Sequence, residues 1–200
     1  MKKVLVIGIN GSPHKNGDTV KVLKEVLGGV TKNGGITKLL HLADFKMKPY
    51  HGFYKRKPDK ETLRILKILE TADGIVFATP THWFSPSSLM KLLVDNLTYW
   101  EEVEKFKMEN KVVGVVAHSW EDGAFTAARD LIGVLNTMGA VVPPYAINMR
   151  NKYLKKNQET EWMWNDMELL GKNMVIACEM VQKLKPNWDY KGKKFLEAAK

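Results

Sequence analysis

The sequence predicts an α/β protein in which helices cover both faces of a parallel sheet. Strand patterns alternate with amphipathic helix patterns five times along the 200 residues, and this alternation is typical of parallel sheets. The central strand patterns 75–78 and 111–117 are apolar on both faces, as expected when helices lie on either side. A polar loop, residues 11–19, separates the first strand from the first helix, at the place where such sheets bind ligands.

The first part of the chain contains two strand patterns and one helix. The apolar run 4–9 is the first strand, and apolar residues at helical spacing from Val20 to Val30 mark the first helix. Asn33-Gly34-Gly35 ends that helix, and residues 36–42 form the second strand. The basic connection 44–60 is long for a compact domain, and loops of that length are often functional.

The middle of the chain repeats the order of helix, strand and loop. Apolar residues from Leu63 to Leu69 mark a helix that ends near Asp73, and the strand 75–78 follows. The loop 79–87 then leads to a helix that Ser87 or Ser88 can cap. In that helix Leu89, Leu92, Leu93, Leu97 and Trp100 are expected to face inward.

A fourth and a fifth strand pattern follow. The apolar run 111–117 leads into the loop 118–123 and then into a helix with inward residues from Ala128 to Met138. Residues 140–147 predict the fifth strand. Because Pro143-Pro144 cannot donate hydrogen bonds to a sheet, this strand should lie at an edge.

The last long helix carries an inward stripe from Trp164 to Leu184 and ends at Lys185-Pro186. We expect one domain over residues 1–185 and a basic C-terminal tail over residues 186–200. The one cysteine, Cys178, lies inside the helix pattern, so it is expected to be a buried, reduced thiol.

Composition places the chain among ordinary globular proteins and excludes several classes. Hydrophobic residues make up 44% and charged residues 26%. No apolar run approaches the ~20 residues of a membrane span, and no signal peptide precedes the first strand, so we expect a cytoplasmic protein. The net charge of +9 is spread over all segments without a dense basic and aromatic stretch, which favours a solvated surface over a nucleic-acid interface. One cysteine and five histidines without ligand spacing predict no metal site.

The loop 11–19 has the chemistry of a phosphate site. A loop that joins a strand to a helix directs backbone N–H groups and the positive end of the helix dipole toward one point. Gly11 and Gly17 are expected to allow sharp turns, and Ser12, Asn16 and Thr19 add side-chain donors. The loop lacks the endings of nucleoside-triphosphate and dinucleotide loops. It suits a terminal monophosphate, although an ordinary turn with Asp18 or Thr19 as helix cap remains the alternative.

Strand order decides which loops share the crevice. In a five-stranded sheet of order 2-1-3-4-5, the order reverses between the first and third strands, and ligands bind there. The loops 11–19 and 79–87 then face each other, with the loop 118–123 beside them.

At these loops the chain resembles the NADPH-dependent FMN reductase family. Its Gly11–Thr19 stretch is similar to the family's Gly-Ser-Pro-Arg-Lys-Asn-Gly-Asn-Thr loop, and Pro80–Pro86 is similar to the family's Pro-Thr/Val-Tyr-Trp/Phe loop at the flavin ring. The resemblance covers roughly residues 3–147. It implies a flavodoxin-like three-layer sandwich with a five-stranded parallel sheet of order 2-1-3-4-5, and FMN as cofactor.

The resemblance also assigns residues to FMN binding. Ser12, Asn16 and Thr19 would hold the phosphate, residues 80–84 would line the ring, and Ser119 and Trp120 would flank it. The full set of expected FMN-binding residues is Ser12, His14, Asn16, Gly17, Asp18, Thr19, Pro80, Thr81, His82, Trp83, Phe84, Ser119, Trp120 and Gly123. Packing in the core or between subunits is the alternative for Trp83 and Phe84.

Two features depart from the family pattern. Asp18 replaces the usual Asn and would place a carboxylate near a phosphate dianion, so its side chain should cap the helix or turn to solvent. Iron–sulfur members of this group carry a cysteine motif after the second strand, whereas Pro49–Phe53 contains no cysteine, which excludes a cluster. The connection 44–60 is expected to cover the flavin or to contact another subunit.

The function that follows is an FMN-dependent oxidoreductase. It would take hydride from NADPH or NADH and pass electrons to a small acceptor such as a quinone or a free flavin. It would need no catalytic side chain of its own. The alternatives are an FMN electron carrier without NAD(P)H activity and a flavin-free binding protein of the same fold.

A homodimer or homotetramer is also expected. Trp162, Met163 and Trp164 cannot all face inward on one helix, and the aromatic stretch 50–54 adds apolar surface.

Overall fold

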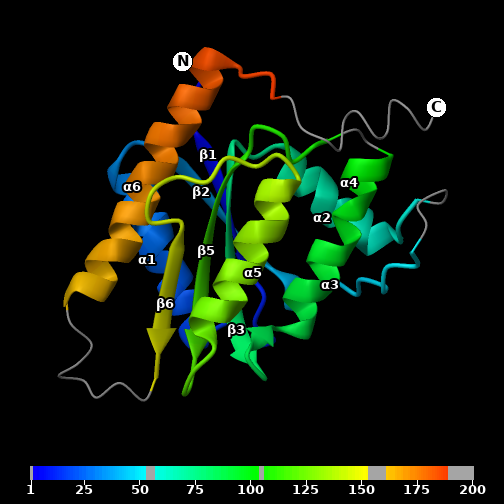
Figure 1. The fold of residues 1–200 in the computed structure, drawn as a ribbon, viewed down its shortest axis with the longest axis horizontal. Helices are drawn as coiled ribbons and strands as arrows, with labels where there is room; N and C mark the ends of the chain where they lie inside the picture. The colour runs from blue at the N-terminus through cyan, green and yellow to red at the C-terminus, as the bar shows by residue number, and fades with distance from the viewer. Residues whose placement is uncertain (1, 53–56, 104–105, 153–160, 189–200) are drawn as a thin grey trace.

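The computed structural model describes residues 2–52, 57–103, 106–152 and 161–188 (Figure 1). A parallel sheet runs through the centre, and its neighbouring strands lie in the order β2-β1-β3-β5-β6. This confirms the predicted order of the parallel strands. Their bounds are β1 (Leu5–Asn10), β2 (Ile36–His41), β3 (Gly74–His82), β5 (Val112–Ser119) and β6 (Ile147–Asn151).

A short antiparallel strand lies outside the parallel order. Strand β4 (Ser85–Pro86) folds back onto the end of β3, where Thr81 pairs with Pro86 and His82 pairs with Ser85. The sequence pattern did not reveal this hairpin, because two residues are too few to show an alternation.

Helices cover both faces of the sheet (Figure 1). Helices α1 (Asp18–Lys32) and α6 (Glu161–Leu184) pack against each other on one face. The opposite face is covered by α2 (Lys60–Glu70), α3 (Ser88–Asn96), α4 (Thr98–Glu102) and α5 (Ala124–Thr137), and a short 3₁₀ helix, η1 (Leu42–Asp44), follows β2. The resulting three layers confirm the flavodoxin-like sandwich.

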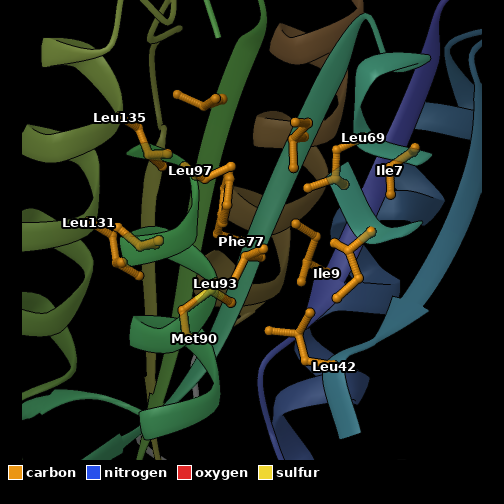
Figure 2. Packing of buried hydrophobic residues seen from close by; sticks show 14 of the residues in the cluster. Ile7, Ile9, Leu42, Leu69, Phe77, Met90, Leu93, Leu97, Leu131 and Leu135 are labelled. Carbon is orange, nitrogen blue, oxygen red and sulfur yellow. The ribbon is translucent and has the colours of Figure 1, made fainter. Parts of the chain in front are cut away.

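The core is divided by the sheet into two apolar clusters. Alternate residues of each strand point to opposite faces, so Ile7, Ile9 and Phe77 contact the helices of the α5 side (Figure 2). Val6 and Val76 lie in the second cluster, under α1 and α6. Both clusters bury strand residues completely, which explains why the central strands read as continuous apolar runs.

The fifth strand begins later than predicted. Residues 140–147 were expected to form it, but β6 starts at Ile147 and only Val141 makes an isolated parallel bridge, to Val112. Pro143 and Pro144 lack the N–H that a strand needs, so the chain crosses the edge there without pairing. The predicted edge position of this strand is confirmed by the sheet order.

Several boundaries also differ from the sequence prediction. Gly17, not Asp18 or Thr19, is the N-cap of α1, so the expected side-chain cap is absent there. The helix predicted from Ser88 to Trp100 consists of α3 and α4, which meet at Leu97, and the prediction of Ser87 as its cap is confirmed by the bond from Met90 N–H to its hydroxyl. Leu184 was expected to face inward but is exposed.

The predicted buried thiol is confirmed. Cys178 is 1% exposed, and burial raises the pKa of its thiol to about 12, so it stays protonated at neutral pH.

The described part of the connection 44–60 lies against the core of the α5 side. Phe45 and Met47 are buried there, and the Asn96 side chain donates to the carbonyl oxygen of Lys48 at 3.0 Å. Residues 53–56 lie outside the described residues, and a contact of this connection with the flavin or a second subunit stays a prediction. None of the helices in the described ranges is both long and apolar enough to cross a bilayer.

Candidate functional site

The loop between β1 and α1 is held in shape by its own polar side chains. Asn10, fully buried at the end of β1, accepts a hydrogen bond from Ser12 N–H at 3.1 Å and donates to the carbonyl oxygen of His14 at 3.2 Å. The Ser12 hydroxyl oxygen accepts from His14 N–H at 3.1 Å. Because this bond uses only a lone pair, the hydroxyl proton of Ser12 stays available to a ligand.

Gly11 allows the loop to lie close to the neighbouring strand. Its N–H donates to the carbonyl oxygen of Ala78 at 2.7 Å, and a Cβ at this position would come within 2.9 Å of Met90. Its backbone has no positive φ, so the contact distances support close approach as its role.

The start of α1 presents unused backbone donors. The first N–H groups of a helix have no partner within the helix, and Gly17 at the N-cap offers no side chain to satisfy them. The hydroxyl groups of Ser12 and Thr19 lie beside this helix start, and both residues are buried. A phosphate dianion suits such a place, since the helix dipole and the N–H groups both favour negative charge.

The hairpin between β3 and β4 presents two aromatic residues at its tip. Trp83 and Phe84 are the two residues between the paired positions 82 and 85, and both have positive φ, 48° and 63°. Two-residue hairpins with this conformation strongly prefer Asn and Gly, because a side chain is strained there. Trp83 is 93% exposed and Phe84 59%, so burial within this chain does not offset the strain. Backbone strain that burial does not offset is typical of a functional position.

Polar contacts tie this hairpin to the phosphate loop. The Thr79 hydroxyl accepts from Ser87 N–H at 2.9 Å, and the Ser87 hydroxyl donates to the carbonyl oxygen of Gly11 at 2.7 Å. Ser87 also caps α3, so one side chain connects the helix, the hairpin and the loop 11–17.

The loop after β5 lies against the hairpin tip. Gly123 has φ 84°, and a Cβ built on it would lie 2.7 Å from the Cα atom of Phe84. No larger residue fits without moving the aromatic tip. Gly123 therefore acts on the site by permitting this contact.

The three loops enclose a crevice at the carboxyl ends of the parallel strands. One hollow of about 330 Å³ lies at the start of α1, and an adjoining hollow of about 340 Å³ lies at the hairpin tip. Thr81 and Trp120 line both hollows, so the two adjoin, and together they make up the crevice. The first is lined by Ser12, Pro13, His14, Gly17, Asp18, Thr19, Pro80, Thr81, His82, His118, Trp120 and Lys152, and the second by Thr81, Trp83, Phe84, Trp120, Glu121 and Asp122.

Buried polar atoms without partners lie around this crevice. The hydroxyls of Thr81 and Ser119 make no hydrogen bond with any described residue. His118 is 5% exposed, and burial lowers the pKa of its imidazole against the opposing attraction of the Asp18 carboxylate. Unsatisfied buried groups are costly, so their clustering indicates that a ligand with polar edges completes the site.

Most residues assigned from sequence line this crevice, with three exceptions. Asn16 is exposed and lines neither hollow, Ser119 is buried beneath the surface of the crevice, and Gly123 contacts Phe84. Sequence reasoning did not assign His118 and Lys152. His118 directly follows the predicted strand 111–117, and this position was the signal that could have found it. Lys152 lies beyond the predicted strand 140–147, and only the observed end of β6 at Asn151 places it at this edge of the sheet.

A larger hollow of about 1170 Å³ lies away from this crevice. It is formed by the last turns of α5, the segment 138–142, α4 and Trp188, near the amino ends of the strands. None of the residues assigned to flavin binding lines it. We assign the ligand site to the smaller crevice, because only there do backbone donors, hydroxyls and an aromatic wall converge.

Comparison with known proteins now identifies the family. The model of the NADPH-dependent FMN reductase family matches residues 3–153. The chain belongs to this family. It is a flavoprotein of a family of flavin-dependent oxidoreductases, and its cofactor is FMN.

Relatives and solved structures agree with this assignment. An iron–sulfur flavoprotein of Methanocaldococcus jannaschii is 32% identical over 118 residues, which span 56% of this chain and 60% of that protein. One from Archaeoglobus fulgidus is 28% identical over 71% of this chain and 72% of that protein. The chain thus matches less than two thirds of the first relative's length.

Structural likeness extends over almost the whole chain. RosB, solved with bound 8-demethyl-8-formylriboflavin-5′-phosphate, has a TM-score of 0.82 at 19% identity, over 98% of this chain and 86% of that chain. An NADH:FMN oxidoreductase in its apo form has a TM-score of 0.67 at 17% identity, over 88% of this chain and 90% of that chain. These likenesses support the flavodoxin-like fold.

The crevice fits FMN, and the chain does not fit an iron–sulfur cluster. Donors at the start of α1 suit the phosphate, while the unpaired hydroxyls and the aromatic tip suit the polar edge and the flat face of a flavin. Iron–sulfur clusters are held by several cysteine thiolates, and this chain has only Cys178, buried in α6.

Proposed function

We propose that this protein is an FMN-dependent NAD(P)H oxidoreductase that passes electrons to a small acceptor such as a quinone or a free flavin. The observation that carries the proposal is the strained aromatic tip, Trp83-Phe84, which lies exposed beside a donor-lined helix start in one crevice. Bound FMN supplies the hydride chemistry. The chain's own residues bind the FMN, orient it and shield it.

We assign each part of the crevice a role in binding. Ser12, Thr19 and the first N–H groups of α1 bind the phosphate of FMN. The Thr81 hydroxyl is suited to donate to the polar edge of the ring, because its oxygen is buried, lies at both hollows and has no partner among the described residues.

The aromatic residues define where the donor enters. Hydride transfer requires the reacting atoms to be about 3–3.5 Å apart in an aligned pose, so a flat slot must hold the nicotinamide against the ring. Trp83 and Phe84 form one wall of such a slot, and Trp120 lies across the same hollow. The net charge of +9 favours the approach of an anionic dinucleotide.

The test is the visible spectrum of the flavin-loaded protein without oxygen. Excess NADPH or NADH should remove the flavin absorbance within seconds, and oxygen or a quinone should restore it. Trp83→Ala should slow this loss more than it weakens FMN binding, because the phosphate site is unchanged. Trp188→Ala, which removes an exposed tryptophan beside the larger hollow and away from the crevice, is the matched control and should leave the rate unchanged.

Two outcomes would contradict the proposal. If both nicotinamides leave the flavin oxidised after minutes while dithionite reduces it, the protein is an FMN electron carrier. If the purified protein is colourless and apo-protein takes up no FMN, the protein is a flavin-free binding protein of the same fold. The oxidoreductase and the electron carrier are then both excluded.

We also propose that the protein forms a homo-oligomer. Trp162 is 56% exposed on α6, while its neighbour Met163 is buried, so one helix face cannot cover both.

A further inference from the structure

The outer side of α6 carries a continuous apolar stripe. The main contacts of this helix are with α1 and with the strands β3, β5 and β6, and Figure 1 shows it along one edge of the molecule. Its exposed apolar side chains recur at intervals of seven or four residues, at Trp162, Leu169, Ile176, Met180 and Leu184. At 3.6 residues per turn, all five fall within about 80° around the helix and extend over about 33 Å. This spacing is typical of a helix that pairs with another helix.

A charged flank runs beside this stripe. Glu168, Lys172, Glu179 and Lys183 are exposed on α6, and their positions fall within about 60° of one another on the same side of the stripe. Carboxylates and ammonium groups alternate along this flank. Glu168 also accepts a hydrogen bond from Lys32 Nζ of α1 at 2.5 Å, which holds the first of these carboxylates in place.

The order of the charges suits an antiparallel pair of identical helices. Glu168 and Lys183 are equally distant from the midpoint between residues 175 and 176, and so are Lys172 and Glu179. A two-fold axis through that midpoint, perpendicular to α6, places each of these carboxylates opposite an ammonium group of a second copy. In such a symmetric contact every pair occurs twice.

A parallel pair would not match these charges. Equivalent flanks face each other in an antiparallel two-fold pair, whereas in a parallel pair each flank faces the opposite flank of the second helix. The opposite flank of α6 carries Asp166, Asn173 and Ala177, and it has no cation within the described residues 162–184. A parallel pair would therefore bring Glu168 near the second copy's Asp166. Like charges across a contact disfavour it, so charge selects the antiparallel pair.

A hollow of about 520 Å³ beside the stripe is independent evidence for a partner helix. It is lined by four residues of α6 and by two at the end of α1, namely Asn165, Glu168, Leu169, Lys172, Lys32 and Asn33. The four from α6 have the spacing i, i+3, i+4 and i+7, which forms the hole that receives one side chain of a paired helix. In the antiparallel register the second copy's Met180 lies opposite Leu169 and Lys172. A flexible methionine suits an irregular gap of this kind.

We propose that the stripe 162–184 of α6 binds the same stripe of a second copy in an antiparallel pair, with the two-fold axis beside Ile176. The apolar contacts supply the affinity. The four charged residues set direction and register, because exposed ion pairs contribute little energy but disfavour wrong pairings. The inference rests on the proposed homo-oligomer and names the surface that forms it.

This pairing leaves both crevices open. Helix α6 begins near the carboxyl ends of the strands, where the Arg150 guanidinium lies over the ring of Trp164 at 5.3 Å. It ends near their amino ends, where a Cβ built on Gly74 would lie 3.1 Å from Cys178 Sγ. In an antiparallel pair the two crevices therefore lie at opposite ends of the dimer. FMN affinity should not change when the copies separate, and a loss of affinity would contradict this arrangement.

Single cysteine variants test the direction of pairing. Native Cys178 does not interfere, since burial raises the pKa of its thiol to about 12. Ile176 lies beside the two-fold axis, so Ile176→Cys should form a disulfide-linked dimer when the folded protein is mildly oxidised. Leu169→Cys and Leu184→Cys would lie about 20 Å and about 26 Å along the helix from their own copies, so they should not cross-link. In a parallel pair all three variants would cross-link.

A charge at the centre of the stripe should separate the copies. Ile176→Glu places two carboxylates across the axis and removes an apolar contact, so the mass from light scattering should fall to half that of the original protein or less. Ile176 is 44% exposed, and Val134→Glu, at a valine of α5 that is 40% exposed, is the matched control and should leave the mass unchanged. Circular dichroism checks that both variants fold. Should Ile176→Glu not fold, the cross-linking of Ile176→Cys still decides the surface.

Charge reversal tests the register. Lys172→Glu alone creates two like-charge contacts and should weaken pairing roughly three- to tenfold. The double variant Lys172→Glu/Glu179→Lys reverses both members of each pair and should restore the original dissociation constant. A double variant that pairs no better than Lys172→Glu would refute this register.

The remaining outcomes separate this surface from self-association itself. A monomer at micromolar concentration would refute both. If the original protein is a dimer that Ile176→Glu does not separate and that Ile176→Cys does not cross-link, the copies meet elsewhere and only the surface is wrong. If Leu169→Cys cross-links as readily as Ile176→Cys, the antiparallel direction is wrong.

Discussion

Replacing Gly123 by Ala should damage the crevice through one contact. The left-handed backbone of Gly123, φ 84°, costs a residue with a Cβ about 1–2 kcal/mol. The new Cβ would also lie 2.7 Å from Phe84 Cα and 2.8 Å from its ring, and overpacking of this kind costs about 1–3 kcal/mol. We therefore expect Gly123→Ala to lower the free energy of unfolding by about 2–5 kcal/mol.

Two other glycines separate these contributions. Gly34 has a similar φ of 86° but no described atom within 4 Å of its built Cβ, so Gly34→Ala measures the backbone strain alone. Gly133 lies inside α5 with equally open space and no positive φ, and Gly133→Ala should stabilise the protein by about 0.5–1 kcal/mol. The difference between the Gly123 and Gly34 variants, about 1–3 kcal/mol, then reports the contact with Phe84.

The free energy of unfolding of all three variants is measured by urea unfolding followed by circular dichroism. The values can be compared if the denaturant slope is unchanged. In the Gly123 variant the aromatic tip must move, so FMN and riboflavin should weaken together. A Gly123→Ala protein no less stable than Gly34→Ala would refute the reasoning that Phe84 lies tightly against this loop.

Three more predictions follow from the site, a buried carboxyl and the exposed aromatic surface. Ser12→Ala should weaken FMN roughly ten- to a hundredfold, since a hydrogen bond to a charged group contributes about 1.5–3 kcal/mol; unchanged affinity of apo-protein for FMN would remove Ser12 from the site. Burial, aided by the charge of Glu109, raises the pKa of Glu101 to about 7. The neutral form of Glu101 therefore stabilises the fold fully below the ordinary pKa of 4.5, and this contribution to the free energy of unfolding is lost as the pH rises through 7. Glu101→Gln should therefore be more stable than the original protein at pH 8 and equal to it near pH 4.5 in urea unfolding, and a difference that does not change with pH would contradict this. Light scattering should give a mass of a dimer or more, and the 22.8 kDa monomer at micromolar concentration would count against self-association through Trp162.

The fold and the phosphate loop could be predicted from the sequence, because the patterns that indicate them are local. Apolar residues at periods of 3.6 and 2 predict helices and strands, and alternation of the two predicts a parallel sheet. The errors fell where local signals conflict or are too short. Pro143 and Pro144 interrupt an apolar run that otherwise resembles a strand, and the two residues of β4 carry no period at all.

The aromatic tip shows where local rules mislead. Trp83 and Phe84 occupy the central positions of a two-residue hairpin, where turn chemistry predicts Asn and Gly. Only the pairing of β3 with β4, the bonds of Ser87 and the contact with Gly123 make this conformation possible. No inspection of nearby residues could reveal it, because Gly123 lies almost forty residues further along the chain.

By itself the sequence determined the order of elements, the three loops that meet at one edge of the sheet, and the hydroxyls that suit a phosphate. Tertiary structure alone decided the environment of Asp18. Arg150 and Lys152 reach it because β6 pairs with β5 in one register, and a shift of one residue would turn both side chains to the opposite face. Register depends on the packing of the whole sheet between its helices, so charges from distant segments meet only when the chain has folded.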